Sequence, residues 1–217
     1  MIQHYIVHQN HPTLLLFFAG WGADAHLFNR YRPKDADFMI CYDYRSLLFD
    51  EALLATYTSV HVVAWSMGVW AASSVLEHSH LPIVSACAVN GTCWPMDDTR
   101  GIPIAIFKGT LAGLNPVTIK KFQRRMTSST QEHRAFMLHA PQRPLEELIE
   151  ELAAIEEQLT DAPVSTFPWS KAWIGEKDRI IPPANQRTAW QEMGVAMEQY
   201  DAPHYSEPLF AKLFFDK

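Results

Sequence analysis

Residues 64–68 (AWSMG) place a serine hydroxyl where it could act as a nucleophile. The apolar run before them predicts a buried strand, and residues 66–77 predict a helix whose small side chains let it lie close on a sheet. At a sharp strand-to-helix turn the hydroxyl projects above the sheet, and the residues two before and two after it must be small. Ala64 and Gly68 satisfy that requirement. The competing interpretation is that Ser66 only caps the helix.

A serine hydroxyl needs a base to remove its proton and a carboxylate to orient that base. Of the ten histidines, His204 is the one in a loop after the last predicted strand, which suits the chain order serine, acid, histidine. The Gly-x-x-Asp-x-x-x-Pro pattern of residues 175–182 favours Asp178 as the carboxylate. The alternative is Asp97 or Asp98, in the loop after the fifth predicted strand.

Nucleophilic attack on a carbonyl also needs hydrogen-bond donors for the oxyanion that develops. The backbone N–H of Met67, directly after the serine, is one candidate donor. The second is the N–H of Trp21, because the two glycines of residues 20–22 (GWG) let the backbone turn inward. An ordinary tight turn is the alternative interpretation of these three residues.

The elements that must position these groups are predicted from a series of short apolar runs. Seven strands are expected, at residues 2–8, 13–19, 38–44, 60–65, 84–89, 172–175 and 195–200. The first alternates in polarity and suits an antiparallel edge, whereas the nearly continuous apolar runs suit strands buried on both faces. Residues 144–159 predict a second helix from their apolar spacing. The pattern indicates an α/β fold with a mostly parallel sheet.

Composition excludes several classes of protein. The chain has 217 residues, of which 48% are hydrophobic and 19% charged, so it is expected to be globular. A net charge of −6 argues against nucleic-acid binding by the whole chain, and no apolar run is long enough to cross a membrane. Three cysteines without a CxxC pair, and no secretion signal, favour the cytoplasm. No metal-ligand pattern or glycine-rich nucleotide loop is present, so no cofactor is expected.

Lys and Arg residues are concentrated in one segment of this acidic chain. Seven of the 18 fall in residues 108–143, together with one acid, Glu132: Lys108, Lys120, Lys121, Arg124, Arg125, Arg134 and Arg143. The segment lies between two predicted strands, where an inserted cap (103–162) would interrupt a core made of 1–102 and 163–217. A solvated helical face is one interpretation, and a docking surface for an anionic partner is the other.

Taken together, the sequence resembles the BioG-type pimeloyl-acyl carrier protein methyl ester esterases over nearly its whole length. The motifs that carry the resemblance are FFAGWG, CYDY, VAWSMGVW, AVNGT, GIPIAIFKGTL, FQRRM and the final HY. The resemblance implies an α/β-hydrolase core of about seven strands, with several flanking helices reduced to loops and a small helical lid. Pro203 before the histidine is a departure, because hydrolases often have glycine there.

The resemblance also implies an activity and roles for particular residues. Such an enzyme cleaves the methyl ester of pimeloyl-acyl carrier protein methyl ester, which releases methanol and a free carboxylate for biotin synthesis. The implied roles are nucleophile for Ser66, base and then acid for His204, orienting carboxylate for Asp178, oxyanion hole for Trp21 and Met67, acyl-chain walls for Trp65, Phe122 and Phe136, and carrier-protein docking for Lys121, Arg124 and Arg125. A monomer is expected. A generic short-chain esterase or thioesterase and a non-catalytic, hydrolase-like binding protein remain alternatives.

Overall fold

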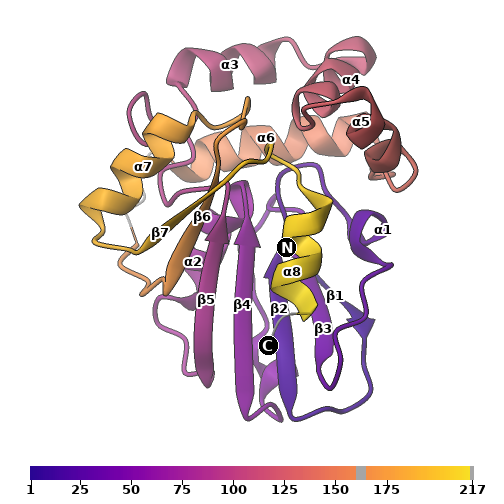
Figure 1. The fold of residues 1–217 in the computed structure, drawn as a ribbon, viewed down its shortest axis with the longest axis vertical. Coiled ribbons are helices and arrows are strands. Elements are labelled where there is room, and N and C mark those ends of the chain that lie inside the picture. Colours follow the sequence, from indigo (N-terminus) through magenta and orange to yellow (C-terminus); the bar gives the residue numbers. More distant parts are fainter. Residues whose placement is uncertain (160–164, 216–217) are drawn as a thin grey trace.

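The computed structural model describes residues 1–159 and 165–215, and Figure 1 shows one twisted sheet flanked by helices. The strands are β1 (Ile2–Val7), β2 (Thr13–Phe18), β3 (Asp37–Tyr42), β4 (Ser59–Trp65), β5 (Ile83–Val89), β6 (Lys171–Gly175) and β7 (Met197–Tyr200). Their order in the sheet is β1-β3-β2-β4-β5-β6-β7. Only β1 runs antiparallel to its neighbour, and every other pairing is parallel. All seven predicted strands are therefore present, and the antiparallel edge is confirmed.

The helices are distributed unevenly along the chain. They are α1 (Ala25–Phe28), α2 (Met67–Leu76), α3 (Ile104–Ala112), α4 (Pro116–Arg125), α5 (Thr130–Met137), α6 (Leu145–Leu159), α7 (Pro183–Glu192) and α8 (Glu207–Phe215), with one 3-10 turn at Glu51–Leu54. The predicted helices 66–77 and 144–159 correspond to α2 and α6. Between β2 and β4, where every residue is described, the helical elements are α1 and the 3-10 turn, on either side of β3, so the expected shortening of flanking helices is observed.

Four helices, α3 to α6, separate β5 from β6, and they are called the cap helices below. Figure 1 shows them across the end of the sheet toward which β4 and β5 point. The boundary predicted between residues 162 and 163 lies outside the described residues. Parallel strands present their carboxyl ends at this edge, where ligands of open α/β sheets bind. The cap helices therefore lie over the part of the sheet where a site is expected.

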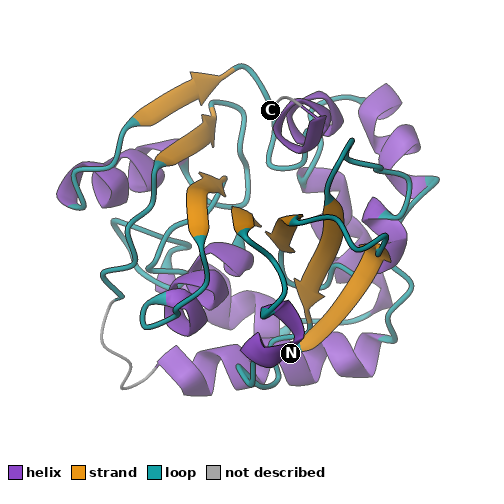
Figure 2. Ribbon diagram, turned by 90° about the horizontal axis from the view of Figure 1, so that it is seen from below, coloured by secondary structure: helices purple, strands orange, loops and turns teal. Residues whose placement is uncertain are grey.

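Two of the packing layers have simple sequence origins. In α6, Leu148, Leu152 and Ile155 recur at helical spacing and are buried against the core. On another side of the sheet, Phe210 and Phe214 of α8 pack edge-on against Phe17 of β2, with ring centroids 5.9 and 5.1 Å away. Figure 2 shows helices on both sides of the strands. Within the described ranges, no helix has both the length and the apolar character required to span a membrane.

Candidate active site

Ser66 occupies the turn between β4 and α2 in a backbone conformation that side chains rarely adopt. Its φ is 58° and its ψ is −125°, in the left-handed region that is strained for residues other than glycine. The backbone segments around Ser66 lie very close to one another. A Cβ added at Gly68 would lie 2.3 Å from the carbonyl oxygen of Phe18, and one at Gly91 would lie 2.4 Å from that of Ser66. Only glycine fits at these two positions, so the turn keeps its shape.

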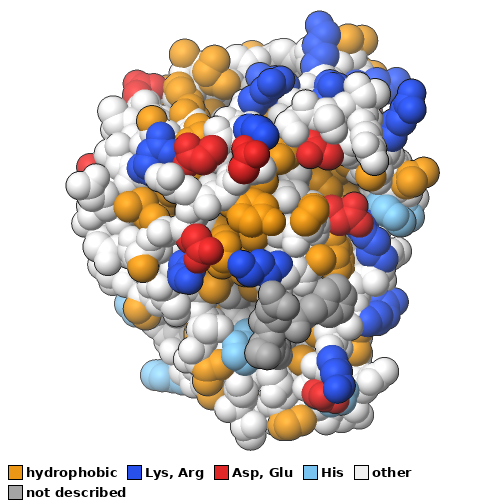
Figure 3. Space-filling view, in the orientation of Figure 1, with side chains coloured by type: hydrophobic (Ala, Val, Ile, Leu, Met, Phe, Trp, Pro, Cys, Tyr) orange, Lys and Arg blue, Asp and Glu red, His pale blue; other side chains and the backbone are white. Residues whose placement is uncertain are grey.

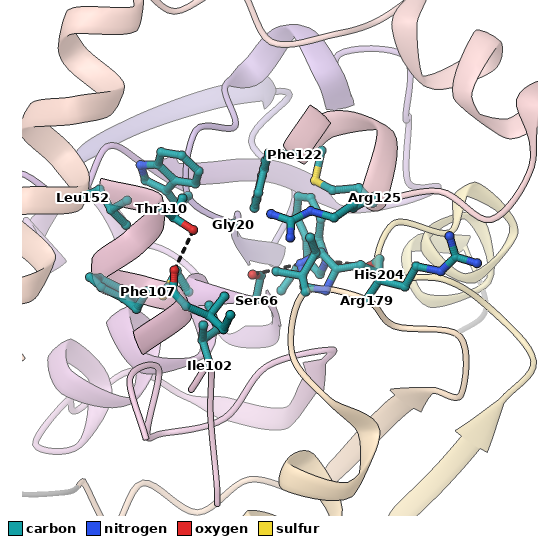
Figure 4. A pocket seen from close by; sticks show the side chains of 16 residues that line it. Gly20, Ser66, Ile102, Phe107, Thr110, Phe122, Arg125, Leu152, Arg179 and His204 are labelled. Atoms are coloured by element: carbon teal, nitrogen blue, oxygen red, sulfur yellow. Dashed lines mark hydrogen bonds between the residues drawn. The ribbon is translucent and has the colours of Figure 1, made fainter. Parts of the chain in front are cut away.

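The predicted serine, histidine and carboxylate lie in one hydrogen-bonded line, of which Figure 4 shows the side chains of Ser66 and His204. His204 Nε2 is 3.0 Å from Ser66 Oγ, and His204 Nδ1 is 2.8 Å from Asp178 Oδ2. All three side chains are buried. When His204 Nδ1–H donates to the carboxylate, Nε2 is left to accept the serine proton. This arrangement can turn a serine hydroxyl into a nucleophile.

Asp178 is held by three further hydrogen bonds. Its Oδ1 accepts from the backbone N–H groups of Ile180 and Ile181, at 2.7 and 3.0 Å. Its Oδ2 also accepts from Gln186 Nε2 at 2.9 Å, and that amide donates to the carbonyl of Ile181 as well. Gln186 is fully buried and was not predicted to belong to the site. Its place in the first turn of α7, just after the acid loop, is the signal that could have revealed it.

The alternative acids, Asp97 and Asp98, have other partners. Asp97 pairs with Arg100 at 2.8 Å, and this hydrogen bond chiefly lowers the pKa of Asp97 to about 2. Asp98 accepts from the backbone N–H of Ile104, at the start of α3. Among the contacts of the described residues, neither carboxylate reaches His204. The structure thus brings Asp178, and not Asp97 or Asp98, to the histidine.

The loop that carries His204 is fixed from two sides. Asn90, at the end of β5, donates from Nδ2 to the carbonyl oxygens of Pro203 and His204, at 3.1 and 2.9 Å. Its Oδ1 accepts from the backbone N–H of Gly175 at 2.6 Å. Trp65 Nε1 donates to the same carbonyl of His204 at 2.9 Å. Trp65, predicted as a wall for the acyl chain, therefore also holds the histidine loop. Pro203 takes part in this loop by accepting the hydrogen bond from Asn90 at its carbonyl oxygen.

Two backbone N–H groups are available beside Ser66. Met67 is the first residue of α2, so its N–H has no acceptor within the helix. Within the described residues the N–H of Trp21 likewise makes no hydrogen bond. Helix α6 holds the loop around Trp21: the indole Nε1 donates to the carbonyl of Leu148 at 3.0 Å, and the N–H of Gly22 donates to Glu151 Oε2 at 3.3 Å.

Glu151 is a fully buried acid that the sequence did not single out. Its Oε1 accepts from the backbone N–H of Tyr44 at 2.9 Å, and its Oε2 lies 2.6 Å from Arg143 Nη1. Burial raises the pKa of Glu151 above its ordinary value, and the nearby Arg143 opposes this effect. Arg143 also lies 3.2 Å from Asp43 Oδ1, at the end of β3. A buried charge network therefore joins α6 to the loops after β2 and β3.

A largely apolar cavity lies over Ser66, between the core and the cap helices (Figure 4). It is lined by Gly20, Trp21, Trp65, Ser66, Met67, Ile102, Ile106, Phe107, Thr110, Phe122, Arg125, Met126, Leu152, Arg179, Ile180 and His204. Four of the residues to which the resemblance gives a role in the oxyanion hole or the acyl-chain wall line this cavity: Trp21, Trp65, Met67 and Phe122. Phe136 lies instead in the wall of an adjoining cavity, because its ring packs edge-on against Tyr205, with centroids 5.1 Å apart.

The three predicted docking cations, Lys121, Arg124 and Arg125, are all exposed on α4. Figure 3 shows Lys and Arg side chains along the upper edge of the molecule, where Figure 1 places α4 and α5. Arg124 donates to the carbonyl of Thr127, just beyond the helix. Arg125 lines the cavity over Ser66, and so does Arg179, which sequence reasoning missed although it directly follows Asp178. Among the described residues, no cluster of three or more His, Cys, Asp or Glu side chains could hold a metal ion.

Solved structures with similar folds include several hydrolases. The crystal structure of BioG from Haemophilus influenzae superposes with a TM-score of 0.88 at 37% identity, over 100% of both chains. A lipase-esterase related protein from Clostridium acetobutylicum has a TM-score of 0.63 at 10% identity, over 92% of this chain and 90% of that one. The second likeness shows the fold alone, which is that of the α/β-hydrolases, as predicted.

Sequence relatives are more mixed in name. The chain is 56% identical over 195 residues to a malonyl-[acyl-carrier protein] O-methyltransferase of Bacteroides fragilis. The matched region spans 90% of this chain but only 40% of that protein. It is 41% identical over 194 residues to an uncharacterized protein of Haemophilus influenzae, with 88% of each covered. A family model described as "Pimeloyl-ACP methyl esterase BioG" matches residues 1–214. The chain therefore belongs to the BioG family, and its hydrogen-bonded serine, histidine and aspartate lie in the fold that this family shares with many esterases.

Proposed function

We propose that this protein is a serine carboxylesterase that hydrolyses the methyl ester of pimeloyl-[acyl-carrier protein] methyl ester. The observation that carries the proposal is the buried line from Ser66 through His204 to Asp178, which opens into an apolar cavity. Membership of the BioG family supports the choice of substrate. The apolar lining suits the methylene chain of a pimeloyl group, because burial of each methylene is favourable by about 0.8 kcal/mol.

The proposed reaction proceeds through an acyl-enzyme. His204 Nε2 accepts the proton of Ser66 as Oγ attacks the ester carbonyl, and the N–H groups of Trp21 and Met67 stabilise the oxyanion. His204 then donates its proton to the methoxy oxygen, so methanol leaves. A water molecule gives its proton to His204 and attacks the acyl-enzyme, and the collapse of this second intermediate frees the carboxylate and returns the proton to Ser66. Asp178 keeps the imidazole oriented throughout.

The reaction named for the Bacteroides relative is the opposite, in its chemical outcome, of the one proposed here. An O-methyltransferase that acts on a carrier-bound acid forms a methyl ester, and the proposed reaction removes one. The chain described here matches only 40% of that longer protein. We therefore assign to this chain the hydrolytic half of such a pair.

In this proposal the cap helices act as a lid inserted between β5 and β6, corresponding to the predicted segment 103–162. Carrier proteins are acidic, and the exposed cations Lys121 and Arg124 lie on the outer surface of that lid. Exposed charge pairs of this kind accelerate encounter more than they increase affinity. The lid would thus select a carrier-bound ester over a free one.

The test compares the wild-type protein with Ser66→Ala on purified pimeloyl-carrier methyl ester, with released methanol and the mass of the carrier as readouts. Removal of the nucleophile should lower turnover by about 10⁴-fold or more. A fluorophosphonate probe that labels Ser66 should label the wild-type protein alone.

The alternatives predict different outcomes. A wild-type protein that cleaves free esters but leaves the carrier-bound ester intact would be a generic esterase. One that neither cleaves an ester nor reacts with the probe would be a binding protein that keeps the hydrolase fold.

A further inference from the structure

Asn90 directly follows β5 and lies beside the three segments that carry Ser66, Asp178 and His204. It stands in the AVNGT motif (88–92), which contributes none of those three side chains. Asn90 is only 1% exposed and its φ is 45°, in the left-handed region that asparagine adopts more readily than most residues. A buried amide needs hydrogen-bond partners, so its contacts indicate what it does.

The side-chain amide of Asn90 joins the loop after β6 to the loop after β7. Its Nδ2 donates to the carbonyl oxygens of Pro203 and His204, at 3.1 and 2.9 Å, and its Oδ1 accepts from the N–H of Gly175 at 2.6 Å. The carbonyl of Gly175 in turn accepts from the N–H of Asp178 at 3.0 Å. One planar group therefore bonds the histidine loop with its donors and the start of the acid loop with its acceptor.

The backbone on either side of Asn90 supports the serine turn. The N–H of Ser66 donates to the carbonyl of Val89 at 3.0 Å. Gly91 packs so closely against the serine turn that a Cβ there would lie 2.4 Å from the carbonyl oxygen of Ser66. The segment that carries Asn90 is thus fixed to the serine turn, and its amide connects that turn to the other two loops.

The acid and histidine loops are also bonded to each other without Asn90. The N–H of Lys177 donates to the carbonyl of Ala202 at 3.0 Å. That bond does not involve the amide of Asn90. Without the amide, the two loops should therefore stay together while their position relative to Ser66 loses an anchor.

We propose that Asn90 is a positioning residue that fixes the His204–Asp178 pair relative to Ser66, an inference that rests on the proposed function. Asn90 is not among the described residues that line the cavity over Ser66, so it acts through the loops. Its effect requires an amide, because a carboxylate of the same shape has no N–H to donate. A misplacement of about 1 Å between reacting groups can cost about 100-fold in rate. The contribution of Asn90 should therefore appear in kcat and not in KM.

The test changes the amide and leaves the backbone conformation accessible. Asn90→Asp keeps the shape of the side chain and can still accept from Gly175, but it presents an oxygen to the two carbonyls. Asn90→Gly also tolerates a positive φ and removes the side chain altogether. The matched control is Asn185→Asp. Asn185 Nδ2 likewise donates to two backbone carbonyls, those of Asp98 and Gly101, at 3.0 and 2.9 Å, but away from the acid and histidine loops.

The first readout is steady-state hydrolysis of dimethyl pimelate and of the carrier-bound ester. Asn90→Asp is expected to lower kcat by about 100-fold and Asn90→Gly by about tenfold on both, with KM within about threefold of the wild type. Asn185→Asp should keep kcat within about twofold. The ratio of kcat for Asn90→Asp to kcat for the wild type should rise from about pH 8 to about pH 5, because a protonated carboxyl can again donate to one carbonyl.

The second readout needs no substrate. The proton between His204 Nδ1 and Asp178 gives a far-downfield NMR signal, and a fluorophosphonate probe reports the reactivity of Ser66. In Asn90→Gly the signal should persist, because the two loops remain bonded to each other, whereas labelling of Ser66 should slow by about tenfold. Loss of the signal together with the labelling would instead mean general disruption of the site, and it would overturn the proposal.

Two further outcomes would contradict the role of Asn90. One is an Asn90→Asp variant whose kcat equals that of the wild type. The other is an equal loss of kcat in Asn90→Asp and Asn185→Asp. Failure of the proposed function has a different result, since the wild-type protein would then leave the carrier-bound ester intact, while the NMR signal and the labelling rates would still test the positioning role.

Discussion

Helices α4 and α6 belong to the same set of cap helices, yet they contact the core in different ways. Helix α6 buries Leu148, Leu152, Ile155 and the carboxylate of Glu151. None of the ten residues of α4, all within the described part of the chain, is buried. One helix is acidic and the other basic, with Lys120, Lys121, Arg124 and Arg125 on α4 and no base on α6.

The two helices are stabilised by different means. Helix α4 is short, and isolated helices of that length are marginal in water. It begins with a capping box, in which Asn115 accepts from the N–H of Thr118 and the hydroxyl of Thr118 accepts in return. Because local hydrogen bonds support it, α4 can leave its cations exposed for a partner. Helix α6 instead depends on the core, and through Glu151 and Leu148 it holds the loop beside Ser66.

The largest effect is expected from Glu151→Gln on α6. The amide has the same shape, but it cannot accept from Gly22, Tyr44 and Arg143 as the carboxylate does. The loop that carries Trp21 should shift, and loss of one oxyanion donor lowers rates by about 10²-fold. We expect kcat to fall by about that factor on free and carrier-bound esters alike, with little change in KM. Steady-state kinetics on both substrates check this.

The matched control for Glu151→Gln is Glu147→Gln. Glu147 lies on the same helix and contacts the same arginine, at 3.4 Å, but it is more exposed and has no hydrogen bond to the loop. It should keep kcat within about threefold. If both variants lost kcat equally, the effect would come from the negative charge of α6 and not from the hydrogen bond between Glu151 and the loop. Hydrogen exchange of the Gly22 amide should be faster in Glu151→Gln than in the wild type, and this difference would locate the effect in the loop.

A second difference concerns stability. Ile155→Ala removes a fully buried side chain of α6 and should lower the free energy of unfolding by about 3 kcal/mol. Val117→Ala on α4, where the side chain is 61% exposed, should change it by less than about 0.5 kcal/mol. Urea unfolding of both variants measures the two values. Similar losses at the two positions would mean that α4 is as firmly anchored as α6.

A smaller effect is expected from Arg124→Glu on α4. It should lower kcat/KM for the carrier-bound ester by about fivefold at low ionic strength, and less at high salt, because exposed charges are screened. The rate on dimethyl pimelate should not change. Lys34→Glu reverses an exposed charge in the loop before β3 and serves as the matched control. If Lys34→Glu slowed the carrier-bound ester as much, net charge alone would explain the effect.

The smallest effect concerns Asp97, in the loop that leads into the cap helices. Its pKa of about 2 in the folded protein lies below its ordinary value, so its ionised form stabilises the fold. That contribution is present above about pH 4 and is lost as the pH falls toward 2. Asp97→Asn should therefore lower the melting temperature by a few degrees at pH 6, and the difference should vanish near pH 2. Its esterase rate should equal that of the wild type, whereas a large loss would restore Asp97 as a catalytic acid.

The parts of the fold that the sequence predicted have strong, regular patterns. The strands are short apolar runs between turns, and the buried stripe of α6 follows the helical period. Within the predicted helical lid (103–162), the individual helices α3, α4 and α5 were not located, because each buries at most one residue and so lacks an apolar stripe. The capping boxes that begin α4 and α5, at Asn115 and Ser129, were the available signals.

Within the site, residues with a fixed place in the chain order could be predicted, whereas those that support them could not. Ser66, Asp178 and His204 follow particular strands. Gln186, Asn90 and Glu151 support them across long sequence separations, and no local pattern marks a side chain whose partners are distant backbone groups. The role of Phe136 as an acyl-chain wall stays a prediction, and its packing against Tyr205 is a contact that only the folded chain reveals.

The crowding at Gly68 and Gly91 has a consequence for mutational tolerance. At both positions any side chain would overlap a carbonyl oxygen, so a library selected only for folding should retain glycine there. Alanine at position 66 would meet no such overlap, because it removes only the hydroxyl, and that hydroxyl makes no capping hydrogen bond to α2. A descendant that lost the serine would therefore keep both glycines and remain folded as a pseudoenzyme. The glycines in a homologous sequence accordingly identify the architecture, and the serine alone identifies the hydrolase.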